Sequence, residues 1–150
     1  MFLIPGYVIT MYITKTPYPL GYREELIRYL RHFAHTQDGG WGLHTAGPST
    51  VFGTALNYVA LRLLGVAKVD PVCIKARQHL LSRGGAVGVP AWGKFWLTML
   101  NVYDFSGMNP IPPEMWVLPY ALPIHPGRMW VHTRMVYLPM VIRVARSLIS

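Results

Sequence analysis

Hydrophobic residues recur at helical spacing in several separate stretches of the chain. One example is Leu26, Leu30 and Phe33, which fall on a single face if this stretch is a helix. Another stretch, residues 51–64, is apolar on nearly every face, as is typical of an inner helix. No stretch shows a convincing strand-like alternation, so the pattern predicts an all-α, antiparallel array. Its helices are expected over residues 22–35, 51–64, 71–83 and 91–103.

The first fourteen residues form an apolar run interrupted by Pro5 and Gly6. A membrane-spanning helix needs about 20 such residues, and a secretory signal begins with basic residues that this run lacks. The run therefore predicts either a buried helix or a contact with a membrane interface.

Capping and helix-breaking residues punctuate the array. Ser49 is expected to cap the helix over residues 51–64, and Asp70 followed by Pro71 marks the start of the next one. Gly107 is expected to close the helix over residues 91–103. Residues 109–126 hold six of the thirteen prolines, so they predict short pieces and extended turns.

The stretch from Trp130 to Met140 combines polar and aromatic groups with apolar neighbours. Helical spacing predicts a helix that bends or ends near Pro139. Taken alone, the stretch is better explained as a buried amphipathic helix with core aromatics. The predicted stripe consists of Trp130, Thr133, Arg134 and Tyr137, with His132 beside it.

The composition is unusually apolar and aromatic. Hydrophobic residues make up 52% of the chain and charged residues only 13%, with five Trp, nine Tyr and eight Met. Such a composition indicates a lined cavity, a missing partner surface or a membrane contact. A single cysteine, Cys73, rules out a disulfide within the chain and a thiolate zinc site, which favours a reducing compartment or the cytosolic side of a membrane.

The net charge of +8 would permit binding to nucleic acid. The basic residues are scattered singly among apolar neighbours, however, and this distribution favours helix surfaces over a nucleic-acid stripe. Familiar catalytic patterns are also missing, since no glycine-rich phosphate loop occurs and His125 and His132 have no supporting metal ligand nearby. We therefore expect no metal site and no nucleic-acid partner.

A set of aromatic residues with one histidine would suit a carbocation. Ring faces attract positive charge and supply no nucleophile to trap it, although aromatic stripes are more often simply core. The set consists of Trp92, Trp96, Trp130, His132 and Tyr137.

Several long motifs occur in a fixed order along the chain. They include Asp38-Gly-Gly-Trp-Gly-Leu-His44, Ser49-Thr-Val-Phe-Gly-Thr-Ala-Leu-Asn-Tyr58, Trp92-Gly-Lys-Phe-Trp96, Pro113-Glu-Met-Trp-Val-Leu-Pro119 and His125-Pro-Gly-Arg-Met-Trp-Val-His-Thr-Arg134. Over residues 1–140 the chain resembles the oxidosqualene cyclases, and among them most closely the lanosterol-forming enzymes of fungi. Residues 141–150 no longer follow the family and are expected to be a divergent tail.

The resemblance implies part of an α/α barrel of the terpene-cyclase type, with no cofactor. The family converts 2,3-oxidosqualene to lanosterol through a carbocation cascade, from one face of the endoplasmic reticulum membrane and on lipid droplets. The implied cavity residues are Trp92, Trp130 and His132, of which His132 would steer the cation and take part in the final deprotonation. Thr133 and Tyr137 would lie at the channel constriction, and Gln37, Gly40 and Trp41 would belong to a degenerate structural repeat.

The family's catalytic acid lies in an Asp-Cys-Thr-Ala-Glu motif that does not occur in this sequence. We therefore expect an N-terminal fragment, whether a true short product or a truncated gene, that is inactive as an isolated chain. The alternative is a non-catalytic lipid-binding or membrane-associated remnant, motivated by the apolar composition.

Overall fold

The computed structural model describes residues 3–108 and 112–149, and within these ranges all regular elements are helical. The predicted all-α fold is therefore confirmed. Four short 3₁₀ turns join the helices: η1 (Gly85–Gly88), η2 (Phe105–Gly107), η3 (Pro113–Val117) and η4 (Pro126–Arg128). The six α-helices are α1 (Leu3–Thr14), α2 (Tyr22–His32), α3 (Val51–Leu63), α4 (Pro71–Ser82), α5 (Ala91–Met99) and α6 (Val131–Ile149).

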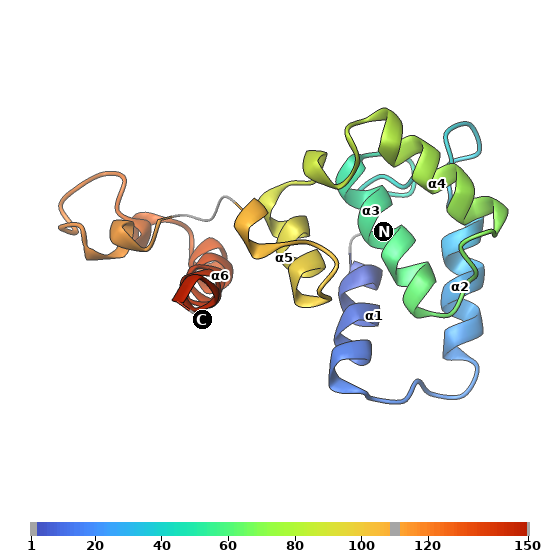
Figure 1. The fold of residues 1–150 in the computed structure, drawn as a ribbon, viewed down its shortest axis with the longest axis horizontal. Helices are drawn as coiled ribbons and strands as arrows, with labels where there is room; N and C mark the ends of the chain where they lie inside the picture. Colours follow the sequence, from blue (N-terminus) through green and yellow to red (C-terminus); the bar gives the residue numbers. More distant parts are fainter. Residues whose placement is uncertain (1–2, 109–111, 150) are drawn as a thin grey trace.

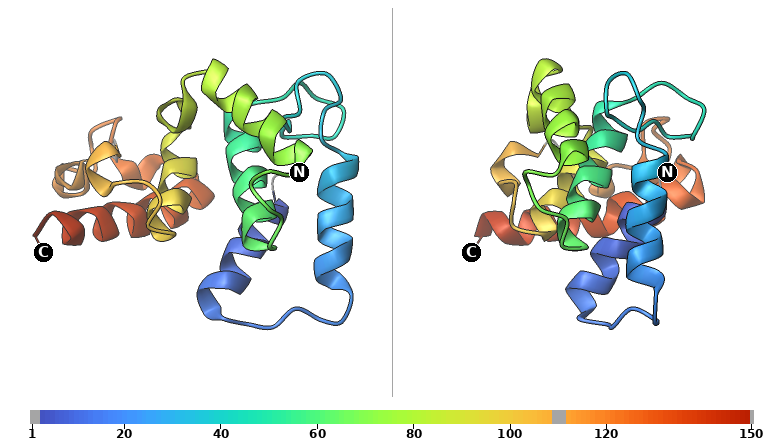
Figure 2. Two further views of the ribbon diagram at one scale, coloured as in Figure 1. Left: turned by 45° about the vertical axis from the view of Figure 1, so that its right-hand side comes forward. Right: turned by 90° about the vertical axis from the view of Figure 1, so that its right-hand side faces the viewer.

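Helix α3 is the inner helix, as its apolar pattern predicts. It packs against α1, α2, α4 and α5, and it contributes the fully buried Ala60 and Leu61 to the main core. Figures 1 and 2 show α1 to α4 gathered at one end of the molecule, with α5 between this group and α6. Helix α5 is thus held by its packing against α3 and lies between the two ends of the molecule.

Helix α1 is the buried helix expected from the apolar N-terminal run. Its Val8 and Ile9 are fully buried, whereas Tyr12 and Ile13 are exposed on other faces. The helix therefore contributes to the core through only part of its surface. None of the described helices is long and apolar enough to cross a membrane.

The N-cap of α3 corrects the sequence prediction. Thr50, not Ser49, accepts the capping hydrogen bond from the backbone N–H of Gly53, at 3.0 Å. The Ser49 hydroxyl instead donates to Asp38, at 2.7 Å. Both residues are good caps by type, so the choice depended on a tertiary partner that the local sequence does not reveal.

Helices α2 and α5 end earlier than predicted, at His32 and Met99. After α5, Asn101 takes a left-handed backbone with φ +57°. The N–H groups of Asn101 and Val102 then donate to Thr98 and Leu97, at 2.9 and 3.0 Å, which closes the helix with a Schellman motif. Gly107 ends the separate turn η2.

Helix α6 continues through Pro139 instead of ending there. The proline leaves the carbonyl of Met135 without its intrahelical donor. Val136 and Tyr137 before the proline, and Met140 after it, pack in one cluster with Met108. Packing on both sides of the proline offsets the lost hydrogen bond.

Candidate aromatic cavity wall

Five residues predicted for the cavity and its constriction line one pocket of about 340 Å³. The rings of Trp130 and His132 meet edge to face, with centroids 4.4 Å apart. Residues from α5 and α6 thus meet although they are about forty positions apart in sequence. The lining consists of Trp92, Trp130, His132, Thr133 and Tyr137, joined by Val136.

A second pocket of about 690 Å³ shares Trp92 and Tyr137 with the first. Its other side is formed by Phe52 of α3 and by Leu43 and His44 of the loop before α3. The two shared rings make the pockets neighbours. The aromatic wall is hereafter the combined lining of these two pockets.

Trp96 and Arg134 lie outside the linings of both pockets. Trp96 packs against the cluster of Ile9, Leu56 and Leu97, so it is a core aromatic. Arg134 is exposed on α6. Helical spacing placed these two side chains near the wall but could not decide whether they faced it.

Trp41 ties together α2, α3 and the segment between them. Its side chain is 1% exposed, and its indole N–H donates to the carbonyl of Leu30 near the end of α2, at 2.9 Å. Its backbone N–H donates to the hydroxyl of Thr54 in α3, at 3.1 Å. Gly40 is needed because a Cβ there would lie 2.6 Å from the same hydroxyl. Gln37, the third predicted repeat residue, is exposed.

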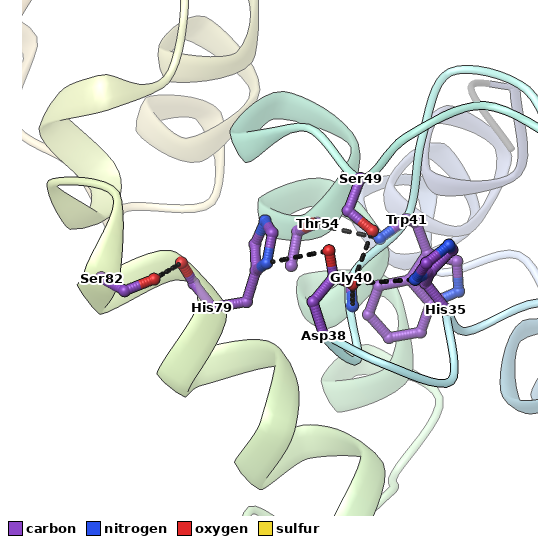
Figure 3. Close-up of polar contacts among 8 residues, drawn as sticks. All are labelled: His35, Asp38, Gly40, Trp41, Ser49, Thr54, His79 and Ser82. Atoms are coloured by element: carbon purple, nitrogen blue, oxygen red, sulfur yellow. Dashed lines mark hydrogen bonds and ion pairs between the residues drawn. The ribbon is translucent and has the colours of Figure 1, made fainter.

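Asp38 organises the polar contacts around Trp41, as Figure 3 shows. Its carboxylate accepts from the Gly40 N–H at 2.9 Å and from the Ser49 hydroxyl, and it faces His79 and His35 at 3.5 Å. Burial alone would raise the pKa of the Asp38 carboxyl. The two hydrogen bonds and the two histidines outweigh that effect and lower the pKa below its ordinary value.

The sequence profile of the squalene-hopene cyclase N-terminal domain matches residues 4–149. The chain belongs to this cyclase family. It is 61% identical over 140 residues to a lanosterol synthase of Pneumocystis carinii, covering 93% of this chain and 20% of that protein. It is also 60% identical over 139 residues to the lanosterol synthase of Saccharomyces cerevisiae, with 93% and 19% covered.

A cycloartenol synthase of Dictyostelium discoideum is nearly as similar to this cyclase-family chain, at 59% over 140 residues, with 93% of this chain and 20% of that protein covered. The chain thus spans about a fifth of the length of the curated relatives it matches. The matches do not favour the alternative of a non-catalytic lipid-binding remnant. Where the predicted tail begins is not decided by them, and the boundary at residue 140 stays a prediction.

The aromatic wall of this cyclase-family chain is suited to an apolar, cationic species. Indole and phenol rings stabilise positive charge, by about 2 kcal/mol for a desolvated contact. Among the described lining residues, His44 and His132 each carry an imidazole, and none carries a carboxyl group. The wall can therefore stabilise a cation and accept a proton, but it holds no strong acid.

The sequence-based site missed His44, Leu43 and Phe52. The motif from Asp38 to His44 was noted, but its histidine lies 88 positions before His132, and no local pattern places the two in neighbouring pockets. The only available signal was the run of glycines around Trp41. Such a run indicates close packing of the loop, and this packing brings His44 to the wall.

We expect the stability contributed by Asp38 in this cyclase-family chain to be lost in acid. Because its pKa is lowered on folding, its contribution is complete above the unfolded value of about 3.9 and disappears as pH falls through the folded value. Urea titrations of wild type and Asp38→Asn should differ at pH 6, and the difference should begin to shrink only as pH falls below about 3.9. A difference that is constant down to pH 2.5 would contradict this assignment.

Proposed function

We propose that this chain forms one wall of the cavity of an oxidosqualene cyclase that produces lanosterol for sterol biosynthesis. The observation that supports the proposal most is the single pocket lined by Trp92, Trp130, His132, Thr133 and Tyr137. High identity to lanosterol synthases of two fungi also supports it.

The proposed roles follow from the chemistry of the side chains. The rings of Trp92 and Trp130 stabilise the carbocation as it migrates through 2,3-oxidosqualene. The imidazole of His132, held edge-on to Trp130, steers the cation and helps to accept the proton lost in the last step. Thr133 and Tyr137, one helical turn apart on α6, form the constriction through which the substrate enters.

The isolated chain is expected to make no cyclic triterpene. Epoxide opening needs a strong proton donor, and no carboxyl group lies among the described lining residues of either pocket. Purified chain should be incubated with 2,3-oxidosqualene in detergent and the products separated by gas chromatography. Any lanosterol above a heat-denatured control would contradict the expectation.

A chimera tests the parent activity. Residues 1–140 should replace the aligned segment of the Saccharomyces cerevisiae lanosterol synthase, in cells that lack their own enzyme. We expect lanosterol to form and His132→Ala in the chimera to reduce it or change the product pattern. A folded chimera that forms cycloartenol would overturn the product assignment. A folded chimera that neither binds nor converts oxidosqualene would overturn the proposed cyclase function.

We also propose that the full-length protein attaches to one face of the endoplasmic reticulum membrane and to lipid droplets. The substrate is an insoluble hydrocarbon epoxide, so an entrance at the membrane surface would deliver it directly. Co-sedimentation of the chimera with phospholipid vesicles tests this attachment, and a chimera that stays in the supernatant at low and high salt would argue against it.

A further inference from the structure

The loop from Gly42 to Pro48 carries part of the aromatic wall. Leu43 and His44 line the second pocket, and the tip of the loop turns through a hydrogen bond from the Gly47 N–H to the His44 carbonyl, at 3.2 Å. Leu43 is 46% exposed, and His44 is exposed as well. The position of His44 therefore depends on how the two ends of the loop are held.

The ends of the loop are joined by one carboxylate. Asp38 Oδ1 accepts from the Gly40 N–H before the loop and from the Ser49 hydroxyl after it, at 2.9 and 2.7 Å. A backbone hydrogen bond from the Thr50 N–H to the Trp41 carbonyl, at 3.0 Å, lies next to this junction. Hydrogen bonds to a charged acceptor are stronger than neutral ones, so Asp38 is the strongest polar tie at the base.

The same carboxylate is fixed from outside the loop. The ring of His79 on α4 is 3% exposed, and its Nδ1 lies 3.5 Å from Asp38 Oδ2, as seen in Figure 3. Next to Asp38, Gly39 has φ +67°, and a Cβ there would lie 2.3 Å from the Cβ of Lys75 on α4. The base of the loop is thus pressed against a packed helix, which makes it a rigid support.

From these contacts we propose that Asp38 is a positioning residue, which holds Leu43 and His44 against Trp92 and so shapes the second pocket for the substrate. This role rests on the proposed function, because it assigns oxidosqualene to a pocket that adjoins the predicted cavity. The hydrogen bonds of Asp38 go to Gly40 and Ser49, one on each side of the loop, so it acts through the loop.

Three variants separate positioning from a general effect on stability. Asp38→Ala removes both hydrogen bonds, Ser49→Ala removes one, and Asp38→Asn keeps an acceptor oxygen but loses the charge. The matched control is Asp104→Ala, which removes an exposed carboxylate that accepts from the Ser106 N–H at 2.8 Å and lies outside both pockets. In this control, residues 42–49 should exchange hydrogen for deuterium as they do in wild type.

Hydrogen–deuterium exchange of the complete chain measures the loop without any ligand. We expect amides of residues 42–49 to exchange at least tenfold faster in Asp38→Ala, several-fold faster in Ser49→Ala and within about threefold of wild type in Asp38→Asn. Amides at the centre of α3 should keep their protection in all variants. Unchanged loop exchange in Asp38→Ala, or an equal increase across α3, would overturn the proposal.

Binding of 2,3-oxidosqualene from detergent micelles supplies the second measurement. Asp38→Ala is expected to weaken it about fivefold, with Asp38→Asn close to the wild-type value. The substrate should slow exchange of residues 42–49 in the wild type and in Asp38→Asn, but not in Asp38→Ala. If the wild-type chain binds no oxidosqualene, the proposed function fails. The exchange rates then still decide whether Asp38 holds the loop, so the two failures are distinguishable.

Discussion

Replacing Trp41 with alanine is expected to destabilise the chain by about 3–5 kcal/mol, the range observed when large buried aromatics are truncated. The side chain is 1% exposed and packs in the core cluster with Leu30, Ala60 and Leu61. The substitution also leaves the Leu30 carbonyl without its indole donor, at the point where α2 meets the loop. Because domains of this size are stable by only 5–15 kcal/mol, a large share of the free energy of unfolding would be lost.

Urea denaturation followed by circular dichroism at 222 nm measures this loss. Trp41→Phe keeps most of the buried ring and should cost less than Trp41→Ala, since only the hydrogen bond and part of the area are removed. Trp130→Ala is the matched control, because Trp130 is 71% exposed and should change stability by less than about 1 kcal/mol. Equal losses in Trp41→Ala and Trp130→Ala would mean that Trp41 does not support the core.

Much of the helical array could be predicted because its signals are local. The Asp70–Pro71 pair does start α4, with the Asp70 carboxylate accepting from the Val72 N–H at 3.0 Å. The end of α5 could not be predicted, because a left-handed Asn101 replaced the expected glycine stop. The path of α6 through Pro139 depended on packing against Met108, a residue distant in sequence.

The predicted wall residues were brought together, but the resemblance to a known family carried that prediction. Residue type alone grouped Trp92 with Trp96 in the set suited to a carbocation, and the structure separates them, with Trp92 in both pockets and Trp96 in the core. Which of two aromatics on one helix faces a cavity depends on the neighbouring helices. For the same reason His44 could be found only once the loop was seen against α5.

The four tryptophans discussed above fall into two groups according to their contacts. Trp41 and Trp96 are packed into the core and belong to the stability of the helical array. Trp92 and Trp130 line the pockets and keep part of their apolar surface in contact with solvent, being 37% and 71% exposed. Exposed rings that share a pocket with an imidazole are typical of a binding surface.

Replacing Trp92 with alanine is therefore expected to weaken binding as well as lower stability. Trp92 is the α5 residue common to both pockets and is 37% exposed. Removing about 80 Å² of contact with a hydrocarbon ligand costs about 2 kcal/mol at 25 cal/mol per Å², or roughly 30-fold in Kd. Because Trp92 is only 37% exposed, its truncation also lowers the urea midpoint, so the affinity is measured under conditions in which the variant is folded.

Partition of labelled 2,3-oxidosqualene between detergent micelles and the chain gives the affinity. Trp92→Phe keeps an aromatic face toward both pockets, so its loss should be well below that of Trp92→Ala. Tyr120→Ala removes an exposed aromatic outside both pockets and should bind as wild type does. If Trp92→Ala keeps wild-type affinity while Tyr120→Ala loses it, the substrate binds elsewhere. The aromatic wall would then be a surface that the rest of a longer cyclase covers, and not part of the reaction cavity.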